Sequence, residues 1–313
     1  MRRTSFLTAL VAVLALLGAA CGDDDDVASE EPVTTTTAVS GGESETEAES
    51  EVESEGGAAT EFPAGSTMAE LKEAGTMTVG TKFDQPLFGV NNAVSGEVEG
   101  FDVEVAKLIA ERIDPEMEVE FIEAVSQNRE PFIQDGRVDM VVATYTINDT
   151  RKEIVDFAGP YYVAGQDIMV KADDTSITGV EDLNGKKVCS VQGSTSIENV
   201  AEQAPQADLS ISFQGYSECA EALADGRVEA VTTDNVILVG LAAESDGAFK
   251  LVEAPFTEEP YGIGVAKGDD EFRDFINDVL EEIYASGEWT AAFEATVGSA
   301  GVATPEPPAV DRY

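Results

Sequence analysis

Residues 136–143 read GRVDMVVA, and residues 226–233 repeat the same design as GRVEAVTT. Each segment begins with a glycine suited to ending a helix, continues with a charged link, and then runs as an apolar stretch of strand length. The repeat predicts two similar α/β halves facing one another. In open α/β sheets, ligands bind beyond the carboxyl ends of the strands. We therefore expect the functional residues in the polar loops that follow these two strands.

Short apolar runs alternate with longer amphipathic stretches around both segments, which favours the α/β class. In the first half the pattern predicts strands at residues 76–80, 117–122 and 138–143 and helices at residues 101–113 and 128–135. In the second half it predicts strands at residues 168–171, 187–191 and 228–233 and helices at residues 196–202 and 219–224.

The first 21 residues are typical of an exported lipoprotein precursor. Arg2 and Arg3 precede the apolar run at residues 6–17, which is too short to span a bilayer but suits a signal peptide. Small residues then lead to Cys21, as in a bacterial lipobox, although Leu17 lies four rather than three residues before the cysteine. We expect residues 1–20 to be a signal peptide and Cys21 to be lipidated. An ordinary secretory signal with a chance cysteine is the alternative.

Residues 21–65 are predicted to be a disordered acidic tether after the lipidated cysteine. Four consecutive aspartates at residues 23–26 and glutamates alternating with small residues at 43–55 leave almost no large apolar side chain. Such a stretch cannot bury enough surface to offset its ordering entropy, and like charges keep it extended.

The charge balance limits the choice of partners and chemistry. Residues 62–313 carry 48 acidic and 16 basic residues, a formal charge of −32, which argues against nucleic acid or an anionic surface as partner. The chain contains no histidine, the commonest general base and metal ligand. Cys189 and Cys219 form an even pair in an oxidising compartment, which favours a disulfide; two free buried thiols are the alternative.

Three motifs, in order, resemble family 3 of the bacterial solute-binding proteins, which serve polar amino-acid ABC transporters. They are residues 100–106 (GFDVEVA), 136–139 (GRVD) and 151–157 (RKEIVDF), and the resemblance runs from about residue 77 to residue 298. Three further motifs are similar to those of the glutamate-binding members, notably actinobacterial lipoproteins. These are residues 80–86 (GTKFDQP), 126–129 (SQNR) and 189–196 (CSVQGSTS).

The resemblance implies an α/β fold of the periplasmic-binding-protein type II, with two lobes joined by a two-strand hinge and the ligand cleft between them. The crossings are expected near residues 161–165 and 257–261. Lobe 1 would take residues 66–162 and 258–298, lobe 2 residues 163–257, and a tail residues 299–313.

For a ligand α-carboxylate, the candidate is Arg151, which we expect in the first turn of a helix starting near residue 148 or 149. A guanidinium grips a carboxylate with two hydrogen bonds, and donors at a helix start add to it. In the family, the matching arginine binds the α-carboxylate, and the residues at Thr144 and Thr146 contribute to the same pocket. Ser194 and Thr195 could close over it from lobe 2. Alternatively, Arg151 only pairs with Glu153 or Asp156 on the surface.

For the ligand ammonium, Asp234 has the required placement, because it follows the predicted buried strand 228–233 on the opposing lobe. The family uses an aspartate there. Its other reading, an N-cap for the helix that follows, is compatible with this role.

For the ligand side chain, the sequence offers Lys82 after the first strand and Arg129 in the motif that begins at Ser126. In glutamate-binding relatives, basic residues in these regions bind the distal carboxylate, whereas glutamine binders tend to lack a cation at the Lys82 position. A solvated strand-end lysine and a helix-surface ion pair of Arg129 with Glu130 or Asp135 are the alternatives.

The sequence thus predicts a lipid-anchored, monomeric binding protein that captures L-glutamate by hinge closure and passes it to an ABC permease. No cofactor, metal or nucleic acid is implied. Aspartate and glutamine are the competing ligands. A sensor module or a dehydratase-like enzyme on the same scaffold are the competing functions, and the enzyme would need a general acid or base that no catalytic motif identifies.

Overall fold

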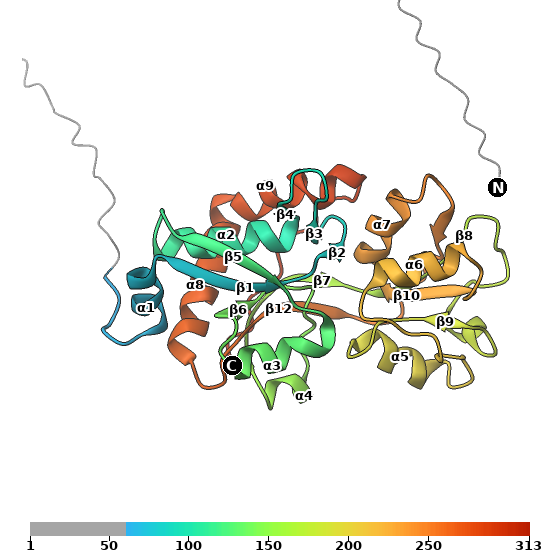
Figure 1. Ribbon diagram of the computed structural model, residues 1–313, viewed down its shortest axis with the longest axis horizontal. Helices are drawn as coiled ribbons and strands as arrows, with labels where there is room; N and C mark the ends of the chain where they lie inside the picture. Colours follow the sequence, from blue (N-terminus) through green and yellow to red (C-terminus); the bar gives the residue numbers. More distant parts are fainter. Residues whose placement is uncertain (1–60) are drawn as a thin grey trace, which may run out of the picture. The chain divides into compact units, whose positions relative to one another are not determined.

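The structure is a computed structural model that describes residues 61–313. The predicted signal peptide, Cys21 and the tether up to residue 60 lie outside the described residues. The described chain folds into two α/β lobes, each built on its own sheet (Figure 1). The predicted fold class is therefore confirmed.

Lobe 1 is built on a five-stranded sheet with the order β5-β1-β6-β12-β7. Its strands are β1 (Thr76–Thr81), β5 (Glu118–Glu123), β6 (Met140–Val141), β7 (Asp156–Ala164) and β12 (Glu259–Val265). Strand β1 is parallel to β5 and β6, whereas β12 is antiparallel to β6 and β7. The helices of this lobe are α1 (Thr67–Ala74), α2 (Phe101–Ile113), α3 (Arg129–Gln134), α4 (Asp149–Lys152), α8 (Asp270–Ser286) and α9 (Glu288–Ala295).

A small antiparallel sheet joins β2 (Asp84–Gln85), β3 (Gly89–Asn91) and β4 (Val98–Glu99). Two 3₁₀ turns, Ser126–Asn128 and Val297–Ala300, complete the elements described in lobe 1.

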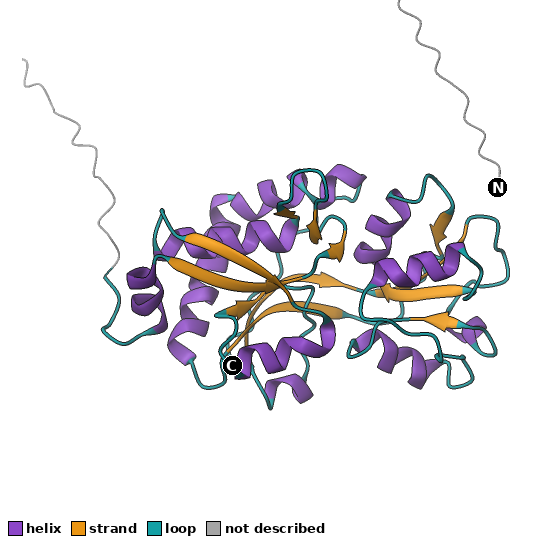
Figure 2. Ribbon diagram, viewed as in Figure 1, coloured by secondary structure: helices purple, strands orange, loops and turns teal. Residues whose placement is uncertain are grey.

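Lobe 2 is built on a four-stranded sheet with the order β11-β8-β10-β9. Its strands are β8 (Gln166–Lys171), β9 (Val188–Cys189), β10 (Ala230–Asp234) and β11 (Phe249–Leu251). Its helices are α5 (Thr195–Gln203), α6 (Tyr216–Ala224) and α7 (Asn235–Ala243), with a 3₁₀ turn at Val180–Leu183. Figure 2 shows these helices beside the strands of the sheet.

The repeated GRV segments end their helices in the same way. Gly136 and Gly226 both adopt left-handed backbone, with φ of 62° and 72°, where glycine carries no Cβ penalty. The following amide of Arg137 donates to the Phe132 carbonyl, and that of Arg227 donates to the Ala222 carbonyl, both at 2.9 Å. The two halves therefore share a helix ending that directs the chain into β6 and β10.

The chain crosses from one sheet to the other at β7 and β12, which overlap the expected crossings (Figure 1). The two strands pair antiparallel, and an aromatic cluster packs against them in lobe 1. In that cluster the Trp289 indole N–H donates to the Tyr161 carbonyl at 2.9 Å. The lobe boundaries themselves stay a prediction. Between residues 61 and 313, no helix combines the length and apolarity that crossing a membrane requires.

Candidate ligand-binding site

A small, nearly closed cavity of about 10 Å³ lies between the lobes and takes its walls from both of them. Lobe 1 contributes Gln85, Ser126, Arg129, Thr144 and Thr146. Lobe 2 contributes Ser194, Thr195, Ser196, Tyr216, Thr233, Asp234 and Ile237. These residues gather because β6, β9 and β10 all direct their carboxyl ends toward the cavity, as expected for parallel strands of α/β sheets. A larger hollow of about 320 Å³ between α6 and α7 is lined by no buried charged side chain.

Asp234 ends β10 and is 4% exposed. Its Oδ2 accepts a hydrogen bond from the Tyr261 hydroxyl at 2.6 Å, while its Oδ1 is buried with no partner among the described residues. Asp234 occupies the N-cap position of α7, yet its side chain makes no capping bond. Burial, with a smaller effect of Glu259, raises the pKa of the Asp234 carboxyl to about 7. A cation beside Oδ1 would compensate for this burial.

Arg129 begins α3 and is 2% exposed. Its guanidinium donates to the carbonyls of Ser126 at 3.3 Å and Ala143 at 3.0 Å, and it lies 4.2 Å from the centre of the Tyr145 ring. No described acidic residue forms an ion pair with it. Burial lowers the pKa of Arg129 to about 10, and the nearby Arg151 acts in the same direction. The alternative of a surface ion pair is therefore wrong.

Lys82 follows β1 and is 1% exposed, so it is not a solvated strand-end lysine. Its Nζ donates to the Ser126 hydroxyl at 3.1 Å. Burial lowers the pKa of Lys82 to about 8, against the opposing effect of the Asp84 charge. Within residues 61–313 Lys82 forms no ion pair. It is therefore the second buried cation, after Arg129, that contacts Ser126 without an acidic partner. Ser126 separates the ammonium from the cavity.

Arg151 lies where the sequence predicted it, in α4, whose N-cap Asn148 accepts the Arg151 amide at 2.8 Å. Its guanidinium donates to the carbonyls of Thr146 at 2.6 Å and Gly193 at 3.3 Å, the latter across the two lobes. It also pairs with Glu130 at 3.4 Å. Arg151 is 7% exposed and lines an adjoining groove rather than the cavity itself.

Thr144 is fixed by a buried acid behind the cavity. It adopts a left-handed backbone with φ of 45°, and its amide donates to Asp102 at 2.8 Å. Tyr161 holds the other oxygen of Asp102 at 2.5 Å, and burial raises the pKa of this carboxyl to about 7. The Thr144 hydroxyl lies 2.9 Å from Gln85 Oε1, which leaves Gln85 Nε2 buried without a partner among the described residues.

Ser194 and Thr195 open α5 in lobe 2. The Ser194 hydroxyl accepts the Ile197 amide as an N-cap and donates to the Val191 carbonyl. The Thr195 hydroxyl lies 2.9 Å from Glu259 and 3.5 Å from the Thr146 hydroxyl of lobe 1. The contact between Thr195 and Thr146 brings the polar loops after β6 and β9 together.

The structure thus brings most of the predicted ligand-binding residues to one cavity. Those that line it are Ser126, Arg129, Thr144, Thr146, Ser194, Thr195 and Asp234. Lys82 and Arg151 each lie one residue behind the wall, in contact with Ser126 and Thr146.

The cavity is also lined by residues that the sequence did not predict: Gln85, Ser196, Tyr216, Thr233 and Ile237. Gln85 and Ser196 belong to motifs already singled out, and Thr233 directly precedes Asp234. Tyr216 carried no signal of its own, because its position depends on where α6 begins.

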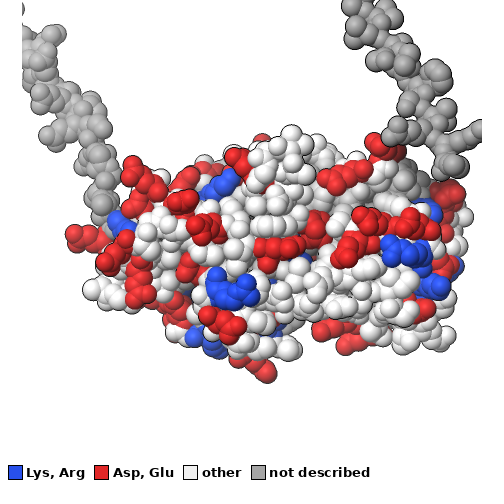
Figure 3. All heavy atoms as spheres, in the orientation of Figure 1, with Lys and Arg blue, Asp and Glu red and all other residues white. Residues whose placement is uncertain are grey.

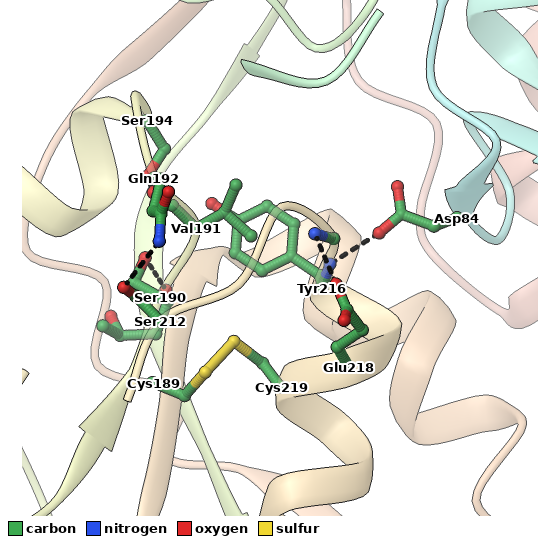
Figure 4. The surroundings of a disulfide bond; sticks show 12 residues. Asp84, Cys189, Ser190, Val191, Gln192, Ser194, Ser212, Tyr216, Glu218 and Cys219 are labelled. Atoms are coloured by element: carbon green, nitrogen blue, oxygen red, sulfur yellow. Dashed lines mark hydrogen bonds between the residues drawn. A yellow bond between two sulfur atoms is a disulfide. The ribbon is translucent and has the colours of Figure 1, made fainter. Parts of the chain in front are cut away.

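The predicted disulfide is confirmed, and the alternative of two free thiols is wrong. Cys189 and Cys219 are bonded, with their Cα atoms 5.6 Å apart. The bond joins β9 to α6, one turn beyond Tyr216 (Figure 4). It therefore ties the helix that brings Tyr216 to the cavity to the central sheet of lobe 2.

Acidic side chains dominate the visible face of the molecule, with few basic ones among them (Figure 3). Lys82 and Arg129 do not contribute to this surface, because both side chains are almost fully buried.

A family model described as bacterial extracellular solute-binding proteins, family 3, matches residues 77–298. The chain is 42% identical over 230 residues to the ABC transporter glutamine-binding protein GlnH of Bacillus subtilis, covering 73% of this chain and 83% of that protein. It is also 42% identical over 237 residues to the glutamate-binding protein GluB of Corynebacterium efficiens, covering 72% and 80%.

Among solved structures, the chain is similar to an ancestral arginine-binding protein bound to glutamine. The TM-score is 0.68 at 39% identity, and the match covers 72% of this chain and 98% of that one.

Proposed function

This chain belongs to family 3 of the bacterial extracellular solute-binding proteins, and we propose that it captures L-glutamate outside the cytoplasm for an ABC permease. The observation that carries the choice of ligand is the pair of buried cations at Ser126. Lys82 and Arg129 are almost fully buried without an ion pair among the described residues. Burying a cation without an acid costs several kcal/mol, which a ligand carboxylate would offset.

The unpaired polar atoms of the cavity support an amino acid as the ligand class. Asp234 Oδ1 is a buried acceptor suited to an ammonium, and Gln85 Nε2 is a buried donor suited to an oxygen. An amino acid carries both kinds of group. We assign the ammonium to Asp234.

We assign the α-carboxylate to Arg151 with Thr144, Thr146, Ser194 and Thr195. To bind it, Arg151 would exchange its longest hydrogen bond, the one to the Gly193 carbonyl at 3.3 Å. The carboxylate would then lie beside the start of α5 in lobe 2, where Ser194 and Thr195 line the cavity. Arg151→Ala should abolish binding of every amino acid that the protein takes.

We assign the distal carboxylate to Arg129 and Ser126, with the charge of Lys82 acting from behind through its hydrogen bond to the Ser126 hydroxyl. The glutamine-binding relative makes glutamine the second candidate, and the Gln85 amide could serve a ligand amide as well as a carboxylate. The charge on Lys82 and Arg129 favours glutamate, because an uncharged ligand leaves both cations uncompensated.

The mechanism is hinge closure. A ligand held by Asp234 and Ser194 of lobe 2 and by Arg129 and Arg151 of lobe 1 favours the closed arrangement, because only that arrangement makes both sets of contacts. The transporter would receive the ligand from the closed form. The signal peptide would direct export, and a lipid anchor at Cys21 would then keep this monomeric protein at the outer face of the membrane.

Equilibrium dialysis with labelled glutamate tests this function. The ligand should bind at about one equivalent and be recovered unchanged, as for a binding protein. Conversion of the ligand would favour a dehydratase-like enzyme on this fold. In cells, Cys21→Ser should move the protein from the membrane fraction to the soluble fraction.

A further inference from the structure

Asp84 of lobe 1 contacts the start of a helix in lobe 2. Its Oδ2 accepts the backbone N–H of Tyr216 at 2.5 Å, across 132 residues of sequence. Figure 4 shows the carboxylate reaching the first turn of α6 from a separate part of the chain. Neither residue was assigned a role by the sequence motifs.

Helix α6 has no capping side chain of its own at this point. Its N-cap is Gly215, whose own N–H donates to Glu218 at 3.2 Å. The first N–H groups of a helix have no partner within the helix, and a carboxylate beside them interacts favourably with the helix dipole. The opposite lobe therefore supplies an N-terminal acceptor that helices usually obtain from residues next to their own first turn.

The contact is close-fitting because lobe 2 presents glycines to lobe 1. A Cβ on Gly215 would lie 2.5 Å from Asp84 Oδ2. Likewise, a Cβ on Gly193 would lie 2.9 Å from Gln127 Cα, and one on Gly240 would lie 2.5 Å from the Pro86 carbonyl oxygen. At Gly193 and Gly240 the neighbouring atoms are backbone, so the lobes leave no room for a Cβ, whereas a Cβ at Gly215 would displace the Asp84 carboxylate.

Both partners in this contact are linked directly to the ligand cavity. Gln85, next to Asp84, lines the cavity from lobe 1, and Tyr216 lines it from lobe 2. The disulfide at Cys219 holds α6 to β9 one turn further along. A displacement of α6 relative to Asp84 would therefore also move a wall of the cavity.

We propose that Asp84 is an inter-lobe latch, a positioning residue that strengthens ligand binding by stabilising the closed arrangement without touching the ligand. The inference rests on the proposed binding of an amino acid by closure. A contact made only in the closed form adds its free energy to the apparent affinity for every ligand that closes the protein. The effect should appear mainly as slower ligand release.

Calorimetric titration of Asp84→Ala with glutamate, and with any other amino acid that the wild type binds, tests the latch. A hydrogen bond to a charged acceptor predicts affinity weakened about tenfold to a hundredfold, by a similar factor for each ligand. Asp84→Asn, which keeps an acceptor without the charge, should lose about threefold. Asp135→Ala, which removes an exposed acid from the same lobe, is the matched control and should bind as the wild type does.

A second pair of variants separates the latch from an electrostatic effect of Asp84 on Lys82. Gly215→Ala should weaken binding by displacing the carboxylate, and the double variant Asp84→Ala/Gly215→Ala should bind no worse than Asp84→Ala alone. The latch is overturned if Asp84→Ala binds within twofold of the wild type, or if it loses glutamate affinity while keeping glutamine affinity. If the wild type binds no amino acid, the proposed function itself is wrong. If the wild type binds an amino acid and Asp84→Ala binds it equally well, only the latch is wrong.

Discussion

Ser126 lies between two cations that this acidic chain buries. Its hydroxyl accepts from Lys82, and its carbonyl accepts from Arg129. Placing Lys82 and Arg129 in the interior without ion pairs removes both charges from water, which is costly unless a ligand anion completes the site.

Lys82→Met removes one of these charges while keeping an unbranched side chain. We expect glutamate affinity to fall about tenfold to a hundredfold and glutamine affinity to change by less than about threefold, because only glutamate carries the distal charge. Calorimetry with both ligands measures this. Equal losses would contradict the assignment of Lys82 to the distal carboxylate.

Asp234 makes the stability of the ligand-free protein depend on pH. Its pKa is raised from 3.8 to about 7, so across this range the folded state holds a proton that the unfolded state has released. Asp234 therefore makes the free energy of unfolding fall as pH rises from about 4 to about 7, by up to about 1.4 kcal/mol per pH unit.

Asp234→Asn should lack this contribution. Urea unfolding of both proteins without ligand, at several pH values between 4.5 and 7.5, compares the slopes. Saturating glutamate should flatten the slope of the wild type, because the ligand ammonium favours the ionised carboxylate. Identical slopes for the two proteins without ligand would show that Asp234 is not the buried acid responsible.

At the scale of elements, α6 is held from two sides. Asp84 contacts its first turn, and the disulfide ties Cys219 to β9. The disulfide closes a loop with a sequence separation of 30 residues, for which the chain-entropy model gives a stabilisation of about 3–4 kcal/mol.

The double variant Cys189→Ala/Cys219→Ala should therefore unfold at a clearly lower urea concentration than the wild type. Adding a strong reductant should shift the wild type in the same direction and leave the variant unchanged. A wild type whose midpoint does not respond to the loss of the bond would contradict this role for the disulfide.

The sequence predicted elements well wherever local patterns determine them. The helix at residues 101–113 agrees with α2 at both ends, because its apolar face and flanking residues are local features. The strand predicted at residues 138–143 is confirmed but shorter, as β6 (Met140–Val141). The pairing continues on either side, where the amides of Asp139 and Val142 donate to carbonyls of β1.

Helix α6 shows why the rest could not be predicted. It begins at Tyr216, three residues before the predicted start at residue 219. Its first amide is satisfied by Asp84 from the other lobe, and no local pattern reveals a partner 132 residues away. Tyr216 was missed as a cavity residue for the same reason.

Arg151 shows the same limit at the site. The sequence placed it correctly at the start of a helix, but its contacts with Gly193 and Glu130 depend on how distant segments meet. Motifs could identify the charged groups of the site, whereas which of them reach the cavity depends on tertiary packing.

At the scale of the whole molecule, two halves with the same strand and helix ending face one cavity. Two strands connect them, and a tyrosine from each strand holds a buried acid: Tyr161 of β7 binds Asp102 of lobe 1, and Tyr261 of β12 binds Asp234 of lobe 2. The crossing strands therefore contact one buried acid in each lobe: Asp234 in the cavity wall and Asp102 behind it. This arrangement connects ligand binding directly to the hinge.

Calorimetric titration of the purified protein with glutamate, aspartate and glutamine tests whether the site selects glutamate. Glutamate should bind at one site per chain and at least about tenfold more tightly than glutamine, because only its side chain compensates the charges of Lys82 and Arg129. Tight binding of glutamine with no measurable binding of glutamate would contradict the assignment of Lys82 and Arg129 to a ligand carboxylate.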